Sequence, residues 1–177
     1  MTEKSKARID DLIALLPDNE KDLYRNIAEY ATKLGYSPAK VKDKYEPVVF
    51  ARKIKNNSYN RLCKISPPNP LTSNDKTTLA LKFYATSDYS DIFHEGVKRE
   101  CESRKTRVGI ESGCNGKCGG CYTYIYPNGK KIACCHDKLI ILPTISDSYL
   151  IEIKNMMKTQ NDFLTKHRTD GSAINSD

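Results

Sequence analysis

Residues 77–84, TTLALKFY, alternate between apolar side chains and side chains of mixed character. Successive side chains of a strand point to opposite faces, so a period of two predicts a half-buried strand. Its buried face would consist of Leu79, Leu81 and Phe83. We therefore expect this stretch to be one strand of a sheet that packs against a core on one side.

Two further strands are predicted upstream. Residues 45–54 and 59–65 both alternate, and the turn-forming sequence KNNS at 55–58 separates them. Cys63 in the second strand is expected to be a small core residue. The segment 66–76, SPPNPLTSNDK, is rich in proline and polar residues and predicts an exposed loop. Together these segments predict an antiparallel sheet of at least three strands.

Helical spacing of apolar residues before the sheet predicts two consecutive helices. The first ends at about Leu16, where Pro17 interrupts the pattern. The second begins at Asp18 and stops at Gly35. Such a pair could be a DNA-binding helix-turn-helix, but neither helix carries a conspicuous set of groove-reading polar residues. The favoured interpretation is an αα-hairpin that covers one face of the sheet.

Two more helices are predicted after the sheet. A helix at 89–104 would bury a stripe that ends with Cys101 and would leave His94 facing solvent. A short apolar strand at 138–142 precedes a closing helix. The inner face of that helix would be formed by Leu150, Ile153, Met157 and Leu164.

The predicted fold class is therefore α+β, with an N-terminal helix pair, an antiparallel sheet and a C-terminal cysteine-rich, zinc-knuckle-like hairpin closed by a helix. Residues 1–107 would form an α+β domain with its helices packed on the sheet. Residues 108–167 would form a metal-binding hairpin plus a strand and a helix, packed on the first part. Residues 168–177 are polar and are expected to be a disordered tail.

Composition and charge narrow the class of protein. No apolar run reaches the roughly 18 residues that span a bilayer, and the N-terminal stretch lacks the continuous apolar core of a secretory signal. We therefore expect a cytoplasmic protein without membrane contact. The net charge of +7 permits weak attraction to nucleic acid but does not establish such a partner.

The cysteines carry the clearest chemical signal. The chain contains 7 of them, and in a cytoplasmic protein this favours metal binding over disulfides. The segment CNGKCGGC at 114–121 surrounds its cysteines with glycines, which allow the backbone to wrap closely around an ion. A second cluster, CCH, stands at 134–136. We predict a structural zinc site with the candidate ligands Cys114, Cys118, Cys121, Cys134, Cys135 and His136.

A hairpin at 121–136 would bring the two clusters together. The Asn-Gly pair at its tip predicts a type I′ turn. Counting outward from that turn puts Cys121 opposite His136, on the face that also carries Cys134. Cys134 or His136 would then complete the zinc site, and Cys135 becomes the alternative if a bulge shifts the register.

The same hairpin carries the tyrosines Tyr122, Tyr124 and Tyr126 beside Lys130 and Lys131. Exposed tyrosines with a basic rim could stack bases. Alternating tyrosines are also simply good strand formers, and this interpretation is favoured.

The leading functional interpretation is a non-enzymatic binding or regulatory protein with a structural zinc. A thiol redox or metal-sensing protein is the alternative, with Cys134 and Cys135 exchanging between metal and disulfide. A small enzyme of unknown class is less favoured, because no triad, phosphate loop or paired carboxylates in motif context are present. An iron–sulfur cluster is also less favoured than zinc. The CxxxCxxC spacing resembles that of radical S-adenosylmethionine enzymes, but Gly120 replaces their bulky residue and too little chain follows to build their barrel.

Several segments together resemble a group of uncharacterised small cysteine-containing bacterial proteins. These segments are LLPDNEKDLYRNIAEYATKLGYSP, LALKFYATSDYSDIF, the cysteine knuckle, YTYIYPNG and IKNMMKTQNDFL. The resemblance spans nearly the whole chain, and it implies no activity, substrate or site.

Overall fold

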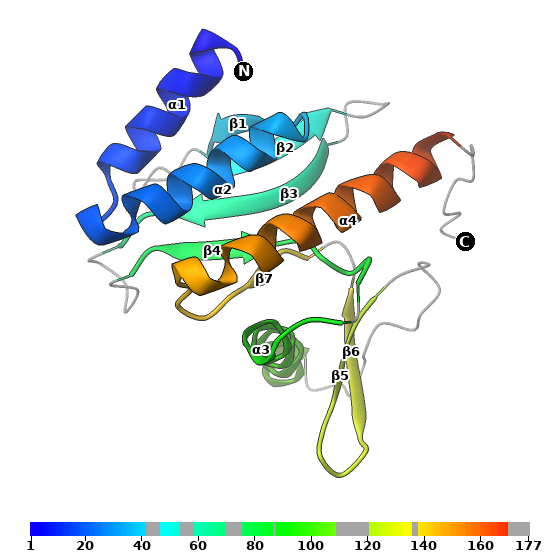
Figure 1. The fold of residues 1–177 in the computed structure, drawn as a ribbon. Coiled ribbons are helices and arrows are strands. Elements are labelled where there is room, and N and C mark those ends of the chain that lie inside the picture. Colours follow the sequence, from blue (N-terminus) through cyan, green and yellow to red (C-terminus); the bar gives the residue numbers. More distant parts are fainter. Residues whose placement is uncertain are drawn as a thin grey trace.

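The computed structural model of the chain describes residues 1–41, 47–53, 59–69, 76–86, 88–108, 121–135 and 138–169. The helices in these ranges are α1 (Glu3–Ala14), α2 (Lys21–Lys33), α3 (Asp91–Val108) and α4 (Leu150–Thr169). The strands are β1 (Ser37–Lys40), β2 (Val48–Lys53), β3 (Tyr59–Ser66), β4 (Thr78–Leu81), β5 (Cys121–Ile125), β6 (Lys131–Cys135) and β7 (Ile140–Ile141). The prediction of an α+β fold with an antiparallel sheet is confirmed (Figure 1).

The N-terminal helix pair forms as an αα-hairpin on the sheet. The Thr2 side chain caps α1 by accepting a hydrogen bond from the backbone N of Ser5 at 3.2 Å. A short 3-10 turn, Asp18–Glu20, precedes α2, and Gly35 follows it with a φ of 88°. Both helices lie across one face of the sheet in Figure 1, as the favoured interpretation predicted.

The main sheet has the order β1-β2-β3-β4-β7, and every neighbouring pair is antiparallel. One register row crosses from β2 to β7 and is buried throughout: Phe50, Cys63, Leu81 and Ile140. The sequence did not predict β1, because its four residues SPAK carry no apolar alternation. Pro38 is tolerated there because β1 is an edge strand.

Strand β3 departs from simple alternation. Its register with β2 shifts between Phe50 and Ala51, so that Cys63 faces Phe50 while Arg61 faces Ala51. Leu62 is therefore the extra residue of a β-bulge, and both Leu62 and Cys63 are buried. Burial raises the pKa of the Cys63 thiol, which agrees with the expected role as a small core residue. The predicted turn at 55–58 lies outside the described residues.

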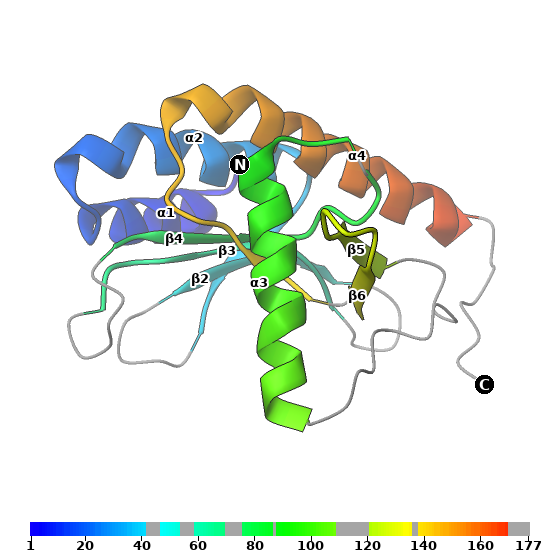
Figure 2. The same ribbon diagram turned by 90° about the horizontal axis from the view of Figure 1, so that it is seen from below.

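The last strand and helix join the N-terminal part of the fold. β7 pairs with β4, and α4 lies beside α2 on the same side of the sheet (Figure 2). Its buried face includes Ile153, Met156 and Met157, so the methionines fill the core. No helix in the described ranges is long and apolar enough to cross a membrane.

Helix α3 runs in a different direction from the other helices and packs against β7, β5 and β6 (Figure 2). Gly96 allows the close approach to β7. A Cβ atom at Gly96 would lie 2.9 Å from Ile140 Cγ2 and 3.2 Å from the backbone O of Ile141. The small residue therefore determines how closely α3 sits against the sheet edge.

Candidate functional site

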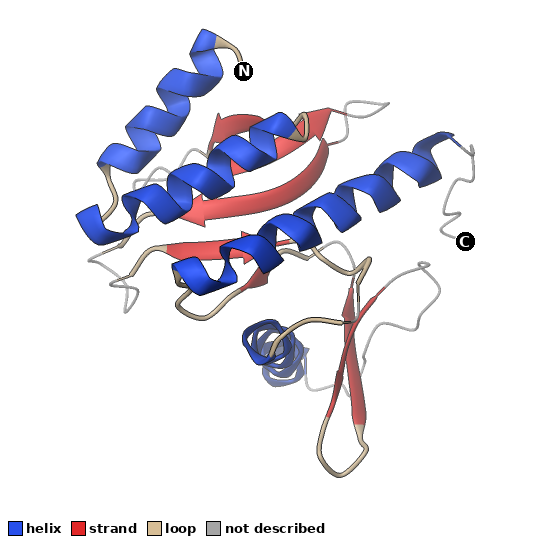
Figure 3. Cartoon of the chain, in the orientation of Figure 1, coloured by secondary structure: helices blue, strands red, loops and turns tan. Residues whose placement is uncertain are grey.

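Strands β5 and β6 form a two-stranded ribbon separate from the main sheet (Figure 3). At its tip, Tyr126 N donates to Lys130 O at 2.8 Å, and Gly129 N donates to Tyr126 O at 2.8 Å. Gly129 has a φ of 79°. Tyr126 thus pairs with Lys130 across the loop 127–129, which is longer than a type I′ turn and matches a turn with a glycine bulge.

The longer loop changes the register of the ribbon. Cys121 lies opposite Cys135, and Tyr122 lies opposite Cys134. The predicted pairing of Cys121 with His136 is therefore wrong, because the extra loop residue moves β6 by one position. A one-residue shift exchanges the two faces of a strand, so Cys134 does not share the face of Cys121.

The neighbouring cysteines of β6 have different surroundings. Cys134 is 0% exposed and belongs to the core cluster together with Tyr122 and Ile132. Cys135 is half-buried. Side chains of adjacent strand residues point to opposite faces, which separates a packing cysteine from an accessible one.

The remaining predicted ligands are only partly within the described chain. Cys114, Cys118 and His136 lie outside the described residues, and Cys121 is described as a strand position. Among the residues that the structure describes, no group of three or more His, Cys, Asp or Glu side chains is placed to hold a metal ion. The zinc site stays a prediction.

Tyr122 is not the exposed tyrosine that a stacking platform requires. It is 1% exposed, and its hydroxyl accepts a hydrogen bond from Phe83 N at 3.0 Å. The same hydroxyl donates to Lys138 O at 3.2 Å. Burial raises the pKa of this phenol. Tyr122 therefore ties the ribbon to the chain just after β4 and just before β7.

The other two ribbon tyrosines are also engaged with α3. Tyr124 is half-buried, with Lys98 Nζ 5.9 Å from the centroid of its ring. The Tyr126 hydroxyl donates to Glu102 Oε1 at 2.6 Å, and this hydrogen bond raises the pKa of Tyr126 to about 12. A row of three exposed tyrosines is therefore not formed, because Tyr122 is buried and Tyr124 and Tyr126 are half-buried.

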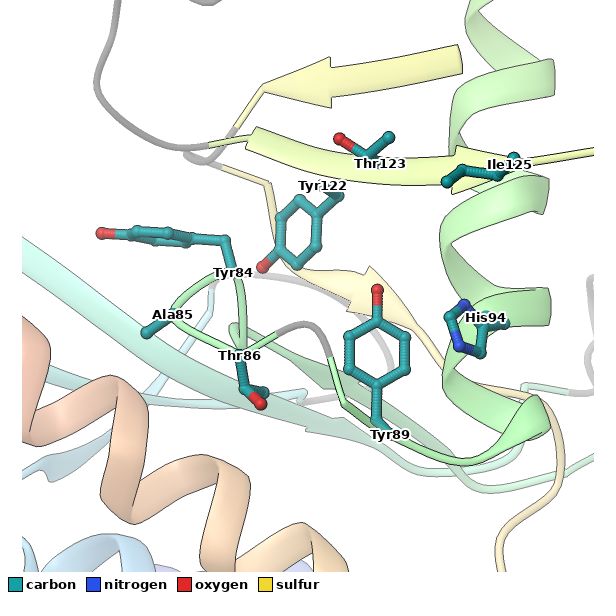
Figure 4. A pocket seen from close by; sticks show the side chains of 8 residues that line it. All are labelled: Tyr84, Ala85, Thr86, Tyr89, His94, Tyr122, Thr123 and Ile125. Carbon is teal, nitrogen blue, oxygen red and sulfur yellow. The ribbon is translucent and has the colours of Figure 1, made fainter. Parts of the chain in front are cut away.

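A cleft of about 370 Å³ lies between β5, the start of α3 and the segment after β4 (Figure 4). The described residues that line it are Tyr84, Ala85, Thr86, Tyr89, His94, Tyr122, Thr123 and Ile125. The sequence did not reveal it, because its walls come from three separate segments. The nearest signal is the run YATSDYS at 84–90, which is rich in tyrosine and hydroxyl groups.

His94 and Tyr89 form one side of the cleft. Their ring centroids are 4.4 Å apart, and the planes are tilted by 44°. His94 is half-buried rather than fully solvent-facing as expected, because the Tyr89 ring covers part of it. In Figure 4 the Tyr89 hydroxyl points toward β5, between Tyr122 and His94.

The segment between β4 and α3, which forms part of the cleft wall, is held by α4. Ala85 N donates to Gln160 Oε1 at 3.0 Å, and Gln160 is completely buried. Ser90 donates to the Glu152 carboxylate through both its backbone N and its hydroxyl, each at 2.7 Å. The segment between β4 and α3 is thus attached to α4 at Ala85 and at Ser90.

The cleft presents a protonated phenol, that of Tyr89. Burial raises the pKa of Tyr89 to about 12, with Cys101 and Cys134 adding to the effect. The phenol is therefore protonated and able to donate a hydrogen bond. No carboxylate, lysine or arginine is among the described residues that line the cleft.

Comparisons of the chain with protein-family models, with curated proteins and with solved structures find no match.

Proposed function

We propose that this chain is a non-enzymatic binding or regulatory protein whose cysteine-rich segment holds a structural zinc ion. The observation that carries the proposal is the register of the ribbon, in which Cys121 lies opposite Cys135. Tyr126 and Lys130 form a hydrogen-bonded pair, and such pairs alternate with non-hydrogen-bonded pairs. Counting from the tip makes Cys121 and Cys135 a non-hydrogen-bonded pair, in which Cα atoms are about 4.5 Å apart.

This spacing suits two ligands of one zinc ion. Thiolates bind zinc at about 2.3 Å in a tetrahedron, which puts two sulfur atoms roughly 3.8 Å apart. Directly opposite strand residues have Cβ atoms about 4.5–5.5 Å apart, so their sulfur atoms can reach that separation. In this proposal the four zinc ligands are Cys114, Cys118, Cys121 and Cys135. His136 is the alternative to Cys135 as the fourth ligand.

Cys134 has a different role in the proposal. Its position on the buried face, opposite Tyr122, makes it a packing residue beneath α3. The opposite face of the ribbon carries the exposed residues Thr123, Ile125 and Lys131 and has little apolar burial. A structural zinc can contribute on the order of 10 kcal/mol to local folding, so the ion would stabilise that face.

Metal analysis of the purified protein tests the proposal. We expect about one zinc per chain, as for a single closed structural site, and loss of most of it in Cys135→Ser. Cys134→Ser is the matched control, since it changes the adjacent residue on the other face and should keep the metal. A purified protein without bound zinc would refute the proposal, as would metal loss in Cys134→Ser but not in Cys135→Ser.

A thiol redox function is the second candidate, and the same register favours it in a modified form. Disulfides join residues whose Cα atoms are about 4.4–6.8 Å apart, a range that includes non-hydrogen-bonded cross-strand pairs. The pair that exchanges between metal and disulfide would then be Cys121–Cys135, because Cys134 and Cys135 lie on opposite faces. Two thiols would give one disulfide, with two protons and two electrons passing to a peroxide, which is reduced to water. Peptide mapping after peroxide treatment tests this pairing, and a Cys134–Cys135 bond would contradict it.

A further inference from the structure

We propose that the cleft beside Tyr89 and His94 binds an uncharged, planar heteroaromatic ring of nucleobase size. The ring would come either from a free nucleoside or from an unpaired base of a single-stranded nucleic acid. The cleft is independent of the zinc site, because no cysteine is among the described residues that line it.

The size and lining of the cleft fit such a ring. Its volume of about 370 Å³ falls in the range of small-molecule sites, which is roughly 300–1,000 Å³. Two half-buried tyrosines and a half-buried histidine supply aromatic surface: Tyr84, Tyr89 and His94. Proteins hold unstacked bases against such side chains, and the flat faces favour a planar ligand.

The cleft also presents hydrogen-bonding groups without partners. Within the described chain, the side chains of Thr86, Tyr89 and His94 make no hydrogen bond, although all three line the cleft. A hydroxyl group can both donate and accept a hydrogen bond, and an imidazole offers two ring nitrogens for hydrogen bonding. Such a mixed set matches the edge of a nucleobase, which carries donors and acceptors side by side.

Charge argues for a neutral ring inside the cleft. An ionised group in a partly buried cleft without a paired charge loses solvation, and no carboxylate, lysine or arginine is among the described lining residues. Nucleobases are neutral at pH 7. The net charge of +7 would act outside the cleft, where it favours the phosphates of a nucleic acid strand.

The walls are fixed before a ligand arrives. Both hydrogen bonds of the Tyr122 hydroxyl hold that ring in place. The Tyr84 ring contacts the ring of Phe163 in α4, with centroids 5.5 Å apart and planes at 82°. A preorganised site loses less conformational entropy on binding, which raises affinity for a ligand of matching shape.

Two sets of probes test the proposal on the full-length protein by NMR chemical-shift titration. The first set is adenosine, guanosine, cytidine and uridine, and the second is short single-stranded oligonucleotides of one base each. We compare wild type with Tyr89→Phe, which keeps the ring and removes the hydroxyl. Tyr59→Phe is the matched control, because Tyr59 is on β3, is 60% exposed and does not line the cleft.

We expect saturable shifts of cleft residues and an affinity about three- to tenfold weaker in Tyr89→Phe, the usual effect of one hydrogen bond. Binding of nucleosides that is insensitive to salt identifies a free-nucleoside site. Binding of oligonucleotides alone, still weakened by Tyr89→Phe and lost at high salt, identifies an unpaired base. The absence of saturable binding by every probe overturns the proposal. Equal affinities of Tyr89→Phe and Tyr59→Phe overturn it as well.

Discussion

Replacing Tyr122 with phenylalanine tests whether one hydroxyl group ties the β5–β6 ribbon to the sheet. The hydroxyl accepts from Phe83 N at 3.0 Å and donates to Lys138 O at 3.2 Å. The ring contact with Phe83, at 5.0 Å between centroids, does not involve the oxygen and should remain. The substitution therefore removes two hydrogen bonds and leaves the packing of the ring intact.

The expected loss of stability follows from the burial of the backbone groups that lose their hydrogen bonds to Tyr122. Phe83 is 0% exposed, so its backbone N–H would lose its partner in a site without solvent. An unsatisfied buried donor costs about 1–3 kcal/mol. We expect the free energy of unfolding to fall by that amount, and a chain of this size loses roughly 2–4 °C of melting temperature per kcal/mol.

Urea unfolding followed by far-UV circular dichroism measures this change. Tyr59→Phe removes a hydroxyl from a side chain that is 60% exposed and serves as the control. The m-values of the proteins must agree, so that a difference in midpoint reports stability. If Tyr122→Phe and Tyr59→Phe lose the same free energy, within about 0.5 kcal/mol, the hydroxyl does not anchor the ribbon and the reasoning is refuted.

Three further predictions concern α3, the cleft and the ribbon. Gly96→Ala should destabilise the fold by about 1–3 kcal/mol, because the clash with the Ile141 carbonyl outweighs the roughly 1 kcal/mol gained in helix propensity. Glu95→Ala is the exposed control, and equal melting temperatures of the two variants would contradict the close approach of α3 to β7. Stability should fall as pH rises above about 10, because the unfolded chain releases the Tyr89 proton first while burial keeps its folded pKa at about 12. This fall should be smaller in Tyr89→Phe, as measured by urea unfolding at pH 9 and pH 11, and an identical fall would exclude the contribution of Tyr89. Cys134→Ser should cost about 1–3 kcal/mol in chelator-treated protein, since it buries a hydroxyl, whereas an unchanged urea midpoint would mean that the core accommodates the oxygen.

Periodicity predicted most of the main body of the fold. The stripe ending near Leu16 and the stripe ending at Gly35 became α1 and α2, and the alternation at 77–84 became β4 and its buried continuation. In each case the spacing of apolar residues within one short segment determines which face of the element packs on the core, and this spacing can be read from the sequence alone. β1 could not be predicted, because Pro38 and its neighbours form a strand only through their pairing with β2.

The candidate site shows where sequence reasoning reaches its limit. Asn-Gly indicated the position of the ribbon turn, but type I′ turns and turns with a glycine bulge both use a glycine at positive φ. The difference is a single loop residue, and it exchanges the roles of Cys134 and Cys135. The cleft could not be predicted from the sequence for another reason: Tyr89 and Tyr122 are far apart in the chain and come together only through tertiary packing.

The pairing of β4 with β7 has a consequence for how the chain could vary in length. These strands are antiparallel neighbours, with Leu81 opposite Ile140, so the chain leaves the sheet and returns beside its point of exit. α3 and the ribbon together form an insertion between two strands that a tight turn could join. Because the cost of closing a flexible loop grows only slowly with its length, residues added at the exposed tip of the ribbon should leave the strand order unchanged.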